Sequence, residues 1–570
     1  MTYHVSLDYE SYEAAREGFE WNVPESYNAA HDLVGKHEDP KARVGLFQAY
    51  PDGRRETYTF HDLDALSNRV ANGLAGLGVE RGDRVGVVVP QKPATVLTHL
   101  ACWKLGAVSL PLSVLFGPDA LEYRLRDSGA AAVVVDESVR ETLEAVRGDL
   151  PDLGHVVEVD GDAAGDALAF ADLHAGESRR FEYAETDGDT PMVVPYTSGS
   201  TGPPKGVVLS HDVWIGHCPA YRMYFERDLD GSVTWTPADW AWLGGLGNLL
   251  SPAWHYGRPV VGYSTGSFDA ETAFSILEEF GVTHAWIPPT AIRMLMSVED
   301  PGERFDLDLE VIAAGGEPLT PEIPEWADET LGVLVNEQYG QTEANLIATT
   351  CQGWFEARPG SMGKPTPGFD VAILDTETRE ELGPGELGEI AVKRDDNPVV
   401  FERYWNQPER TAEVRVDVPG GDASGTPGTP DPSGEWHVTG DLAVRDEDGY
   451  YWFKSRDDDV IITAGYRVGP GEVESAVLDH PDVEQVGVIG VPEETRGEII
   501  KAFVQPVAGV AGDDALREGI RDLVRENLAK HEYPREIEFV EALPTTTTGK
   551  IRRKALRERE RGGDRDGRDT

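Results

Sequence analysis

The chain has 570 residues, 40% of them hydrophobic, and its 51 lysine and arginine residues are outnumbered by 102 aspartate and glutamate residues, which gives a net charge of −51. This length and apolar content predict more than one domain with a sizeable core, and recurring apolar segments argue against a disordered chain. The acidic excess argues against a nucleic-acid partner, because phosphate backbones require a basic surface.

The acidic residues are spread over the whole chain rather than gathered in a tail. We interpret this spread as a surface adapted to a high-salt organism, where ions screen repulsion between like charges; an ordinary acidic protein is the alternative. No apolar run approaches the roughly 18 residues that cross a bilayer, and the first residues lack the apolar stretch of a secretory signal. We therefore expect a cytoplasmic protein with no membrane span. The three cysteines, Cys102, Cys218 and Cys351, form no CxxC pair, which favours reduced thiols.

Short apolar runs alternate with helical patterns over the first four-fifths of the chain. In chain order, the runs predict strands at 83–90, 107–112, 130–136, 282–288, 309–316 and 331–340, and a helix at 95–106. This alternation is typical of α/β layers. It predicts a large N-terminal multi-sheet α/β domain over residues 1–457.

The pattern changes in the last fifth of the chain. Residues 417–436 are rich in proline, glycine, serine and threonine and predict a mobile surface insertion. Beyond about residue 457, three strand patterns and one helical pattern follow, which predicts a small α+β C-terminal domain over 458–560. The highly charged residues 561–570 predict a disordered tail.

The stretch "YTSGSTGPPKG" (196–206) links two ordered segments. Its glycines allow backbone N–H groups to converge on an anion, and its hydroxyls add donors. It is not a Walker A loop, which requires GxxxxGK[ST]. By itself the stretch is either a phosphate cradle or a plain surface loop.

Four further stretches carry polar residues in suggestive places. In "NEQYGQTE" (336–343), Glu343 follows the carboxyl end of a strand, where α/β sheets build ligand sites, and a carboxylate beside a phosphate loop commonly indicates Mg²⁺. In "TGD", Asp441 either accepts hydrogen bonds from two ribose hydroxyls or is simply an aspartate in a turn. The acidic stretch 455–475 is a charged linker or a functional joint, and Lys550 in "TTGK" belongs to a basic surface cluster or to a site.

Taken in this order, "YTSGSTGPPKG", "YGQTE", "TGD", "GYRVGPGEVE" and "PTTTTGK" resemble the acyl-adenylating (AMP-binding) superfamily, which contains acyl-CoA synthetases, nonribosomal peptide adenylation domains and beetle luciferase. Within it, "TRGEIIKAFV" and "KHEYPREIEFV" look most like medium-chain acyl-CoA synthetases, relatives of the acetyl-CoA synthetase-like ligases. The resemblance implies an AMP-forming ligase that uses ATP, Mg²⁺ and CoA to convert a carboxylic acid to an acyl-CoA through an acyl-AMP intermediate.

The resemblance also implies roles for the N-terminal motifs. Phosphate contacts fall to Thr197, Ser198, Gly199, Ser200, Thr201, Gly202 and Lys205, and metal contacts to Glu343 and Thr197. The rest of the nucleotide is bound by Gly316, Glu317 and Pro318, by Gln338, Tyr339, Gly340, Gln341 and Thr342, and, at the ribose, by Asp441 and Arg456. The acyl pocket falls to Trp242, Leu243, Gly244 and Gly340. Acetyl-CoA synthetases carry a tryptophan where this chain has Gly340, so we expect an open pocket for a medium-length, branched or aryl acid.

For the C-terminal region, the resemblance implies a mobile domain that rotates at the hinge residue Asp458 between two half-reactions. Lys550 serves the first, acyl-AMP formation, and Arg467 stabilises phosphate or carboxylate charge. CoA contacts fall to Ala464, Gly465, Tyr466, Arg496, Tyr533 and Arg535.

Three alternatives stay open. The chain could pass its acyl group to a carrier protein instead of CoA, or it could be a short-chain CoA ligase for acetate or propionate. It could also be a non-catalytic sensor, although Lys550, Glu343, Asp441 and Arg456 argue against that. A homodimer is compatible with the sequence.

Overall fold

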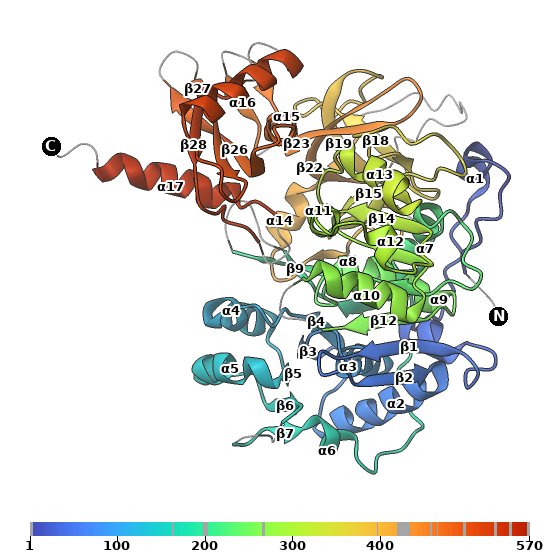
Figure 1. The fold of residues 1–570 in the computed structure, drawn as a ribbon. Coiled ribbons are helices and arrows are strands. Elements are labelled where there is room, and N and C mark those ends of the chain that lie inside the picture. Colours follow the sequence, from blue (N-terminus) through green and yellow to red (C-terminus); the bar gives the residue numbers. More distant parts are fainter. Residues whose placement is uncertain are drawn as a thin grey trace. The chain divides into compact units, whose positions relative to one another are not determined.

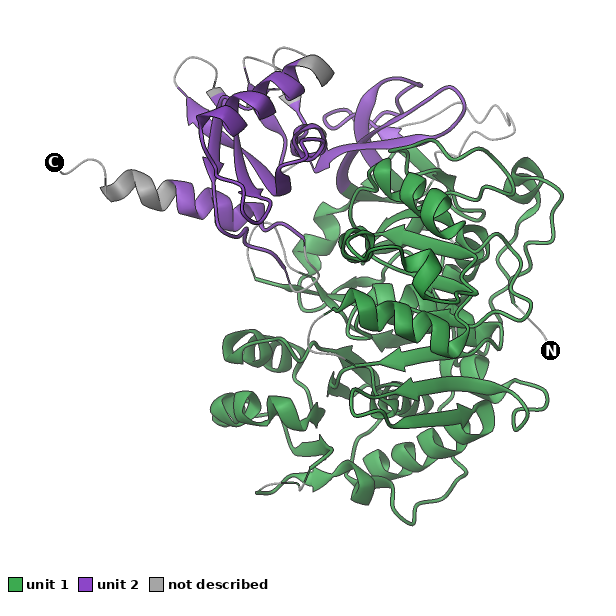
Figure 2. Cartoon of the chain, viewed as in Figure 1, with its two compact units in different colours: residues 1–372, 391–439 green, residues 373–390, 440–570 purple. Residues whose placement is uncertain are grey.

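Figure 1 shows the computed structural model of the chain. The structure describes residues 4–161, 163, 165–197, 203–264, 268–395, 397–418, 434–456, 459–463, 466–493, 497–528, 533–546 and 550–566. The chain forms two compact units, which Figure 2 colours separately. The large unit comprises Met1–Ala372 and Ala391–Thr439, and the small unit comprises Ile373–Ile390 and Gly440–Thr570.

The large unit contains a nine-stranded sheet with a parallel centre. Its order is β17 (Lys364–Pro365), β16 (Ala344–Thr349), β15 (Leu334–Gln341), β14 (Val311–Gly315), β13 (His284–Trp286), β11 (Thr234–Trp235), β12 (Val260–Tyr263), β1 (Val44–Ala49) and β2 (Arg55–Thr59). Strands β15 to β1 in this order are parallel, whereas β16, β17 and β2 are antiparallel to their neighbours. The carboxyl ends of β14 and β15 therefore lie at one edge, where such sheets build ligand sites.

A second nine-stranded sheet carries the glycine-rich stretch. Its order is β20 (Arg403–Tyr404), β10 (Lys205–Ser210), β8 (Pro191–Val193), β4 (Val108–Pro111), β3 (Arg84–Val88), β5 (Ala132–Asp136), β6 (His155–Val159) and β7 (Leu168–Ala169), and β9 (Tyr196–Thr197) pairs with β10. The core strands β4, β3, β5 and β6 are parallel and rich in buried valine, which is typical of strands covered on both faces.

Helices accompany both sheets of the large unit. They are α1 (Tyr12–Gly18), α2 (Phe60–Gly76), α3 (Pro93–Leu105), α4 (Pro118–Ser128), α5 (Arg140–Val146), α6 (Phe170–His174), α7 (Val213–Tyr224), α8 (Leu243–Gly245), α9 (Ser251–His255), α10 (Ala270–Phe280), α11 (Pro289–Met296), α12 (Pro301–Arg304), α13 (Glu322–Trp326) and α14 (Pro408–Glu413).

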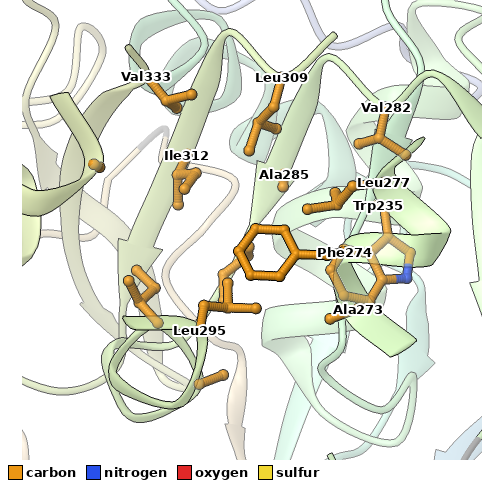
Figure 3. Packing of buried hydrophobic residues seen from close by; sticks show 14 of the residues in the cluster. Trp235, Ala273, Phe274, Leu277, Val282, Ala285, Leu295, Leu309, Ile312 and Val333 are labelled. Atoms are coloured by element: carbon orange, nitrogen blue, oxygen red, sulfur yellow. The ribbon is translucent and has the colours of Figure 1, made fainter. Parts of the chain in front are cut away.

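Helix α10 illustrates how local sequence sets these elements. The Asp269 side chain caps its first turn by accepting from the Thr272 backbone N–H, and Gly281 ends it with a φ of 57°, a left-handed conformation that glycine adopts without strain. Between these signals, Phe274 and Leu277 form an apolar stripe at helical spacing. Figure 3 shows them packed among strand residues of the same cluster, such as Ala285.

The small unit contains an α+β region with its own core. A sheet of order β25 (Tyr466–Val468), β24 (Ile461–Thr463), β27 (Gly497–Pro506) and β26 (Val483–Glu493), with β28 (Glu536–Phe539) on β27, is accompanied by α15 (Pro470–Leu478), α16 (Asp514–Asn527) and α17 (Arg553–Asp566). The remaining strands of the chain are β18 (Val371–Leu374), β19 (Leu387–Lys393), β21 (Arg415–Asp417), β22 (Glu435–Arg445) and β23 (Tyr451–Arg456).

The predicted fold class is confirmed. The strands expected at 83–90, 107–112, 130–136, 282–288, 309–316 and 331–340 are β3, β4, β5, β13, β14 and β15, and the helix expected at 95–106 is α3. The boundary between residues 457 and 458 stays a prediction. Residues 419–433 of the expected insertion lie outside the described residues, and helix α17 enters the segment 561–570 for which the sequence predicts disorder.

Among the residues that the structure describes, no helix combines the length and the apolar character needed to cross a membrane. All three cysteines are free and buried, as the sequence predicts for reduced thiols.

Candidate active site

Three strands of the large unit bring a lysine, a tyrosine and a glutamate together. Strand β10 starts at Lys205, β20 pairs with it and ends at Tyr404, and Glu343 follows β15. Lys205 Nζ donates to the Tyr404 hydroxyl at 3.1 Å, and that hydroxyl donates to Glu343 Oε1 at 2.7 Å. Lys205 Nζ lies 3.7 Å from the same carboxylate oxygen. We call Lys205, Tyr404, Glu343 and the neighbouring Thr197 the phosphate-side cluster.

Glu343 is a buried carboxylate with fixed partners. Only 9% of its side chain is exposed, and burial of a charge is costly unless the charge is paired and hydrogen-bonded. Lys205 supplies the opposite charge and Tyr404 the hydrogen bond, while the Glu343 backbone carbonyl accepts from Phe401 N at 2.8 Å. These contacts therefore fix the position of the carboxyl group.

Thr197 faces this group across the β9–β10 pair, where it is the register partner of Lys205. Its Oγ1 atom is buried and has no hydrogen-bond partner among the described residues. Buried polar atoms in native proteins nearly always have a partner, so such an atom needs an explanation. Residues 198–202, the middle of the predicted phosphate loop, lie outside the described residues.

The donor set of the cluster fits a polyphosphate with a magnesium ion. Mg²⁺ is usually held by one or two carboxylates together with substrate phosphates rather than by a cage of protein ligands. The cluster offers one carboxylate, one ammonium group and the Thr197 hydroxyl, which has no partner in the part of the chain that the structure describes. Within the described ranges there is no group of three or more His, Cys, Asp or Glu that would hold a metal by itself.

The predicted adenine-side residues lie at the carboxyl ends of β14 and β15. Gly315 is the register partner of Gln338, and a Cβ at Gly315 would lie 2.6 Å from the Gln338 backbone carbonyl oxygen, so a larger residue would require the backbone to shift. Gly316 follows with a φ of 88°, which again favours glycine. The next residue, Glu317, accepts a 2.6 Å hydrogen bond from the Thr290 hydroxyl. Sequence segments that are far apart, 316–318 and 338–342, thus lie at one edge of the sheet.

A buried glutamate supports this edge and was not predicted. Glu337 precedes Gln338 on β15, and burial raises the pKa of its carboxyl to about 8. The carboxyl accepts a hydrogen bond from the backbone of Leu319, the residue after Pro318. Glu337 therefore ties the turn at 316–318 to β15. The signal in the sequence is an acidic residue inside a buried strand run.

The predicted residue Gln341 is fixed by two contacts within the large unit. Its Nε2 donates to the Thr439 carbonyl at 2.9 Å, and its Oε1 lies 3.2 Å from His437 Nε2. Burial lowers the pKa of His437 to about 3, so the ring is neutral at physiological pH and its N–H donates to Gln341.

The predicted acyl-pocket residue Gly244 faces an indole. A Cβ at Gly244 would lie 2.8 Å from Cη2 of Trp286, a residue of β13 that is 5% exposed. Trp242, two residues before Gly244 in the sequence, makes an edge-to-face contact with Phe116, with ring centroids 6.0 Å apart. The motifs did not point to Trp286 or Phe116, because these contacts join segments that are distant in the chain.

Gly340 has a structural reason that is independent of pocket size. The register of β15 and β16 shifts between Tyr339 and Gln341, and a Cβ at Gly340 would lie 2.3 Å from the backbone nitrogen of Leu346. Leu346 itself has a φ of 59°, unusual for a residue with a side chain. The close backbone approach in this bulge favours glycine, and the role of Gly340 in the acyl pocket stays a prediction beside that of Gly244.

The small unit holds the predicted ribose pair. Asp441 and Arg456 are register partners on β22 and β23, and Arg456 Nη1 lies 3.4 Å from Asp441 Oδ1. The Asp441 side chain is 8% exposed and that of Arg456 is 46% exposed. The preceding Gly440 donates its N–H to Glu389 Oε1 at 2.8 Å and has a φ of 73°.

The predicted lysine of acyl-AMP formation is exposed, and its backbone is hydrogen-bonded to Thr546. Thr546 N donates to the Lys550 carbonyl at 2.7 Å, and Lys550 N donates to Thr546 Oγ1 at 3.1 Å. Of the predicted CoA residues, Tyr533 has the guanidinium carbons of Arg525 and Arg535 4.5 and 5.0 Å from its ring centroid. Arg525 is a neighbour that the motifs did not indicate.

Part of the predicted site in the small unit lies outside the described residues. Asp458, Ala464, Gly465 and Arg496 lie outside the described residues, as do the side chains of Tyr466 and Arg467 on β25. The large unit thus brings together Thr197, Lys205 and Glu343. Asp441, Arg456, Lys550, Tyr533 and Arg535 belong to the small unit.

Comparison with known proteins shows which family the chain belongs to. The family model "AMP-binding enzyme" matches residues 35–405, and "AMP-binding enzyme C-terminal domain" matches residues 472–550. An acetyl-coenzyme A synthetase of Bacillus subtilis is 36% identical over 93% of this chain and 90% of its own length. The human mitochondrial acyl-coenzyme A synthetase ACSM4 is 34% identical over 94% and 91%.

Among solved structures, the anthranilate CoA ligase AuaEII in complex with anthranoyl-AMP matches with a TM-score of 0.84 and 28% identity, over 95% of this chain and 99% of its own. These matches extend over nearly the whole chain, as the resemblance of its five motifs predicts. The chain belongs to the AMP-binding enzyme family.

Proposed function

We propose that the chain is an ATP-dependent acyl-CoA synthetase. In the first half-reaction, a carboxylate oxygen of the acid attacks the α-phosphorus of ATP, the bond from that phosphorus to pyrophosphate breaks, and acyl-AMP forms. In the second, the thiol sulfur of CoA attacks the acyl carbon, the bond to AMP breaks and the thiol proton is released. Most charge changes fall on phosphate oxygens, so the site must supply fixed positive charge and hydrogen-bond donors.

The observation that carries this proposal is the buried Thr197 hydroxyl, which has no partner among the described residues and lies beside the Lys205–Tyr404–Glu343 group. Thr197 and Lys205 would hold the β- and γ-phosphates with residues 198–202. Glu343, assisted by Thr197, would hold Mg²⁺, which supplies charge neutralisation when bound. Gly316–Pro318 and Gln338–Thr342 would lie along the adenine and the α-phosphate.

The small unit would supply the remaining groups. Asp441 and Arg456 would hold the ribose hydroxyls, and Lys550 would offset charge that develops between the acid and the α-phosphate. We propose that residues 458–560 move about Asp458 between the half-reactions. Ala464, Gly465 and Tyr466, with Arg496, Tyr533 and Arg535, would then serve CoA, and Arg467 would stabilise phosphate or carboxylate charge.

For the acid, we propose a medium-length, branched or aryl carboxylate. The support is the Trp286 indole, which packs directly against the predicted acyl-pocket residue Gly244 and offers an aromatic surface that suits a flat or branched group. Several relatives carry names of this kind, such as the anthranilate CoA ligase. A short-chain acid is the second candidate, favoured by the relative named acetyl-coenzyme A synthetase.

The test is a panel of acids from acetate to benzoate, scored by AMP and pyrophosphate release with ATP, Mg²⁺ and CoA at high KCl. The proposal expects acid-dependent release that needs Mg²⁺, with acyl-CoA as product. Release without transfer to CoA, but with transfer to a carrier domain, would support the carrier-protein alternative. No acid-dependent pyrophosphate release with any acid would favour a non-catalytic sensor.

A further inference from the structure

We propose that helix α4 positions the phosphate-side cluster, and that its residues Tyr123, Arg124 and Asp127 are positioning residues for acyl-AMP formation. The inference rests on the proposed function. None of these residues belongs to the nucleotide or acyl motifs. Tyr123 and Asp127 contact residues that are adjacent in sequence to members of the cluster. Arg124 contacts Phe116, which in turn contacts a predicted acyl-pocket residue.

Asp127 connects two segments of the cluster. Its Oδ2 accepts a 2.7 Å hydrogen bond from the Tyr196 hydroxyl, and Tyr196 is the residue before Thr197. Its backbone carbonyl accepts from Trp405 Nε1 at 3.1 Å and from Asn406 Nδ2 at 2.9 Å, directly after Tyr404. One residue of α4 therefore fixes the chain beside Thr197 and the chain beside Tyr404.

Tyr123 fixes the strand that begins at Lys205. Its hydroxyl donates to the carbonyl of Pro204 at 3.0 Å, and its ring meets that of Tyr196 edge to face with centroids 6.4 Å apart. Tyr123 and Asp127 are four residues apart and therefore lie on one face of the helix. That face holds Tyr196 and Pro204, the residues that precede Thr197 and Lys205.

Arg124 joins the cluster to the acyl side. The residue is 7% exposed, and its Nη1 donates to the Ala120 carbonyl at 2.7 Å. The guanidinium also faces two aromatic rings: its carbon lies 4.1 Å from the Phe116 ring centroid and 5.9 Å from that of Tyr196. Such cation–π contacts are strongest when the cation is desolvated. Phe116 in turn contacts Trp242, a predicted acyl-pocket residue.

These contacts bear on one half-reaction more than on the other. Attack on the α-phosphorus depends on where the phosphates are held, and a misplacement of about 1 Å can cost a hundredfold in rate. Pyrophosphate has left before CoA attacks, so contacts to the β- and γ-phosphates no longer matter. A purely structural role would instead lower both half-reactions together with stability.

The experiment measures both half-reactions in the full-length chain at high KCl. Pyrophosphate release with ATP and the best acid reports the first, and thioester formation from supplied acyl-AMP and CoA reports the second. The variants are Tyr196→Phe and Tyr123→Phe, which each remove one hydroxyl. The matched control is Tyr183→Phe, since the Tyr183 hydroxyl also donates to a carboxylate, Asp64 Oδ1 at 2.9 Å, but contacts no residue of the cluster.

We expect Tyr196→Phe and Tyr123→Phe to lower acyl-AMP formation about tenfold or more and to change thioester formation less than about twofold. Tyr183→Phe should leave the ratio of the two rates unchanged, whatever its effect on the melting temperature. Equal loss in both half-reactions, no loss in either, or the same selective loss in Tyr183→Phe would overturn the inference.

If Tyr196→Phe does not fold, Asp127→Asn decides, because the amide keeps the size of the side chain and leaves the backbone carbonyl bonds to Trp405 and Asn406 in place. A selective loss of acyl-AMP formation supports the positioning role, and an unchanged ratio overturns it. A wild-type chain that releases no pyrophosphate with any acid overturns the proposed function itself, and the inference with it.

Discussion

The Tyr404 hydroxyl donates a 2.7 Å hydrogen bond to Glu343 Oε1 and accepts one from Lys205 Nζ at 3.1 Å. One hydroxyl therefore sets the orientation of the carboxylate proposed to hold Mg²⁺ and of the ammonium proposed to hold phosphate. Residues that orient metal ligands in this way often matter nearly as much as the ligands themselves.

Tyr404→Phe should therefore weaken the use of Mg²⁺ and ATP. We expect a decrease of about 10- to 100-fold in acyl-AMP formation at limiting Mg²⁺, with part of the loss recovered at high Mg²⁺. The measurement is pyrophosphate release against Mg²⁺ concentration. Tyr12→Phe is the control, since that buried hydroxyl donates to the Pro365 carbonyl at 2.8 Å, outside the cluster. An unchanged Mg²⁺ dependence in Tyr404→Phe would contradict the assignment.

Lys550→Ala should separate the two half-reactions. The lysine is exposed and its bonds with Thr546 involve only its backbone, so loss of the side chain should leave the fold intact. We expect acyl-AMP formation to be largely abolished, because the variant removes the positive charge proposed to offset the charge that develops between the acid and the α-phosphate. Thioester formation from supplied acyl-AMP should continue. Lys554→Ala, an exposed neighbour on α17, is the matched control. Equal losses in both half-reactions would refute the role.

Trp286 and Gly244 should shift the preferred acid in opposite directions. Trp286→Ala removes the indole wall, so bulkier acids should gain about tenfold in kcat/KM relative to the smallest acid accepted. Gly244→Ala places a methyl group where a Cβ meets Trp286 at 2.8 Å, which should favour smaller acids. The measurement is kcat/KM over the acid panel. If neither variant changes the order of preference, these two residues do not line the acyl pocket.

Glu337 should make stability depend on pH. Its carboxyl has a pKa of about 8 in the folded chain, raised by burial, against a value of 4.5 for the free side chain. Between these values the unfolded chain has lost the proton that the folded chain keeps, so stability falls as pH rises, by about 1.4 kcal/mol per pH unit. Glu337→Gln keeps the acceptor for Leu319 and removes this slope.

The check is chemical denaturation of both proteins from pH 5 to 8. The free energy of unfolding of Glu337→Gln should exceed that of the wild type increasingly toward pH 8. Glu303→Gln, which alters an exposed acid on α12, should follow the wild-type curve. Parallel curves for Glu337→Gln and wild type would show that the carboxyl is already ionised in the folded chain.

The charge of −51 predicts salt-dependent stability. The screening length falls from about 10 Å at 0.1 M salt to about 3 Å at 1 M, which removes most repulsion between exposed acids. We expect the melting temperature to rise between low salt and molar KCl. A melting temperature that is unchanged or lower in molar KCl would contradict adaptation to high salt.

Much of this arrangement could be predicted from sequence because it is local. The strand runs carry their own apolar pattern, and Thr197, Lys205 and Glu343 stand within short motifs. Tyr404 lies 61 residues from Glu343 and has no motif of its own, so only the pairing of β20 with β10 reveals it. Trp286 and the residues of α4 were missed for the same reason: their contacts arise from packing between distant segments.

Gly340 shows a different limit. The resemblance attributes this glycine to an open pocket, whereas the backbone of Leu346 leaves no room for any side chain there. The sequence does not reveal this backbone contact, and the pocket role of Gly340 stays a prediction.

The same close approach bears on protein engineering. Because a ring at position 340 would first have to displace strand β16, introducing one should disrupt the strand pairing before it narrows any binding space. A library intended to change the preference of this ligase for smaller or larger acids should therefore keep the β15–β16 bulge and vary Trp286. A change in side-chain volume at 286 affects neighbouring side chains rather than the backbone of a strand.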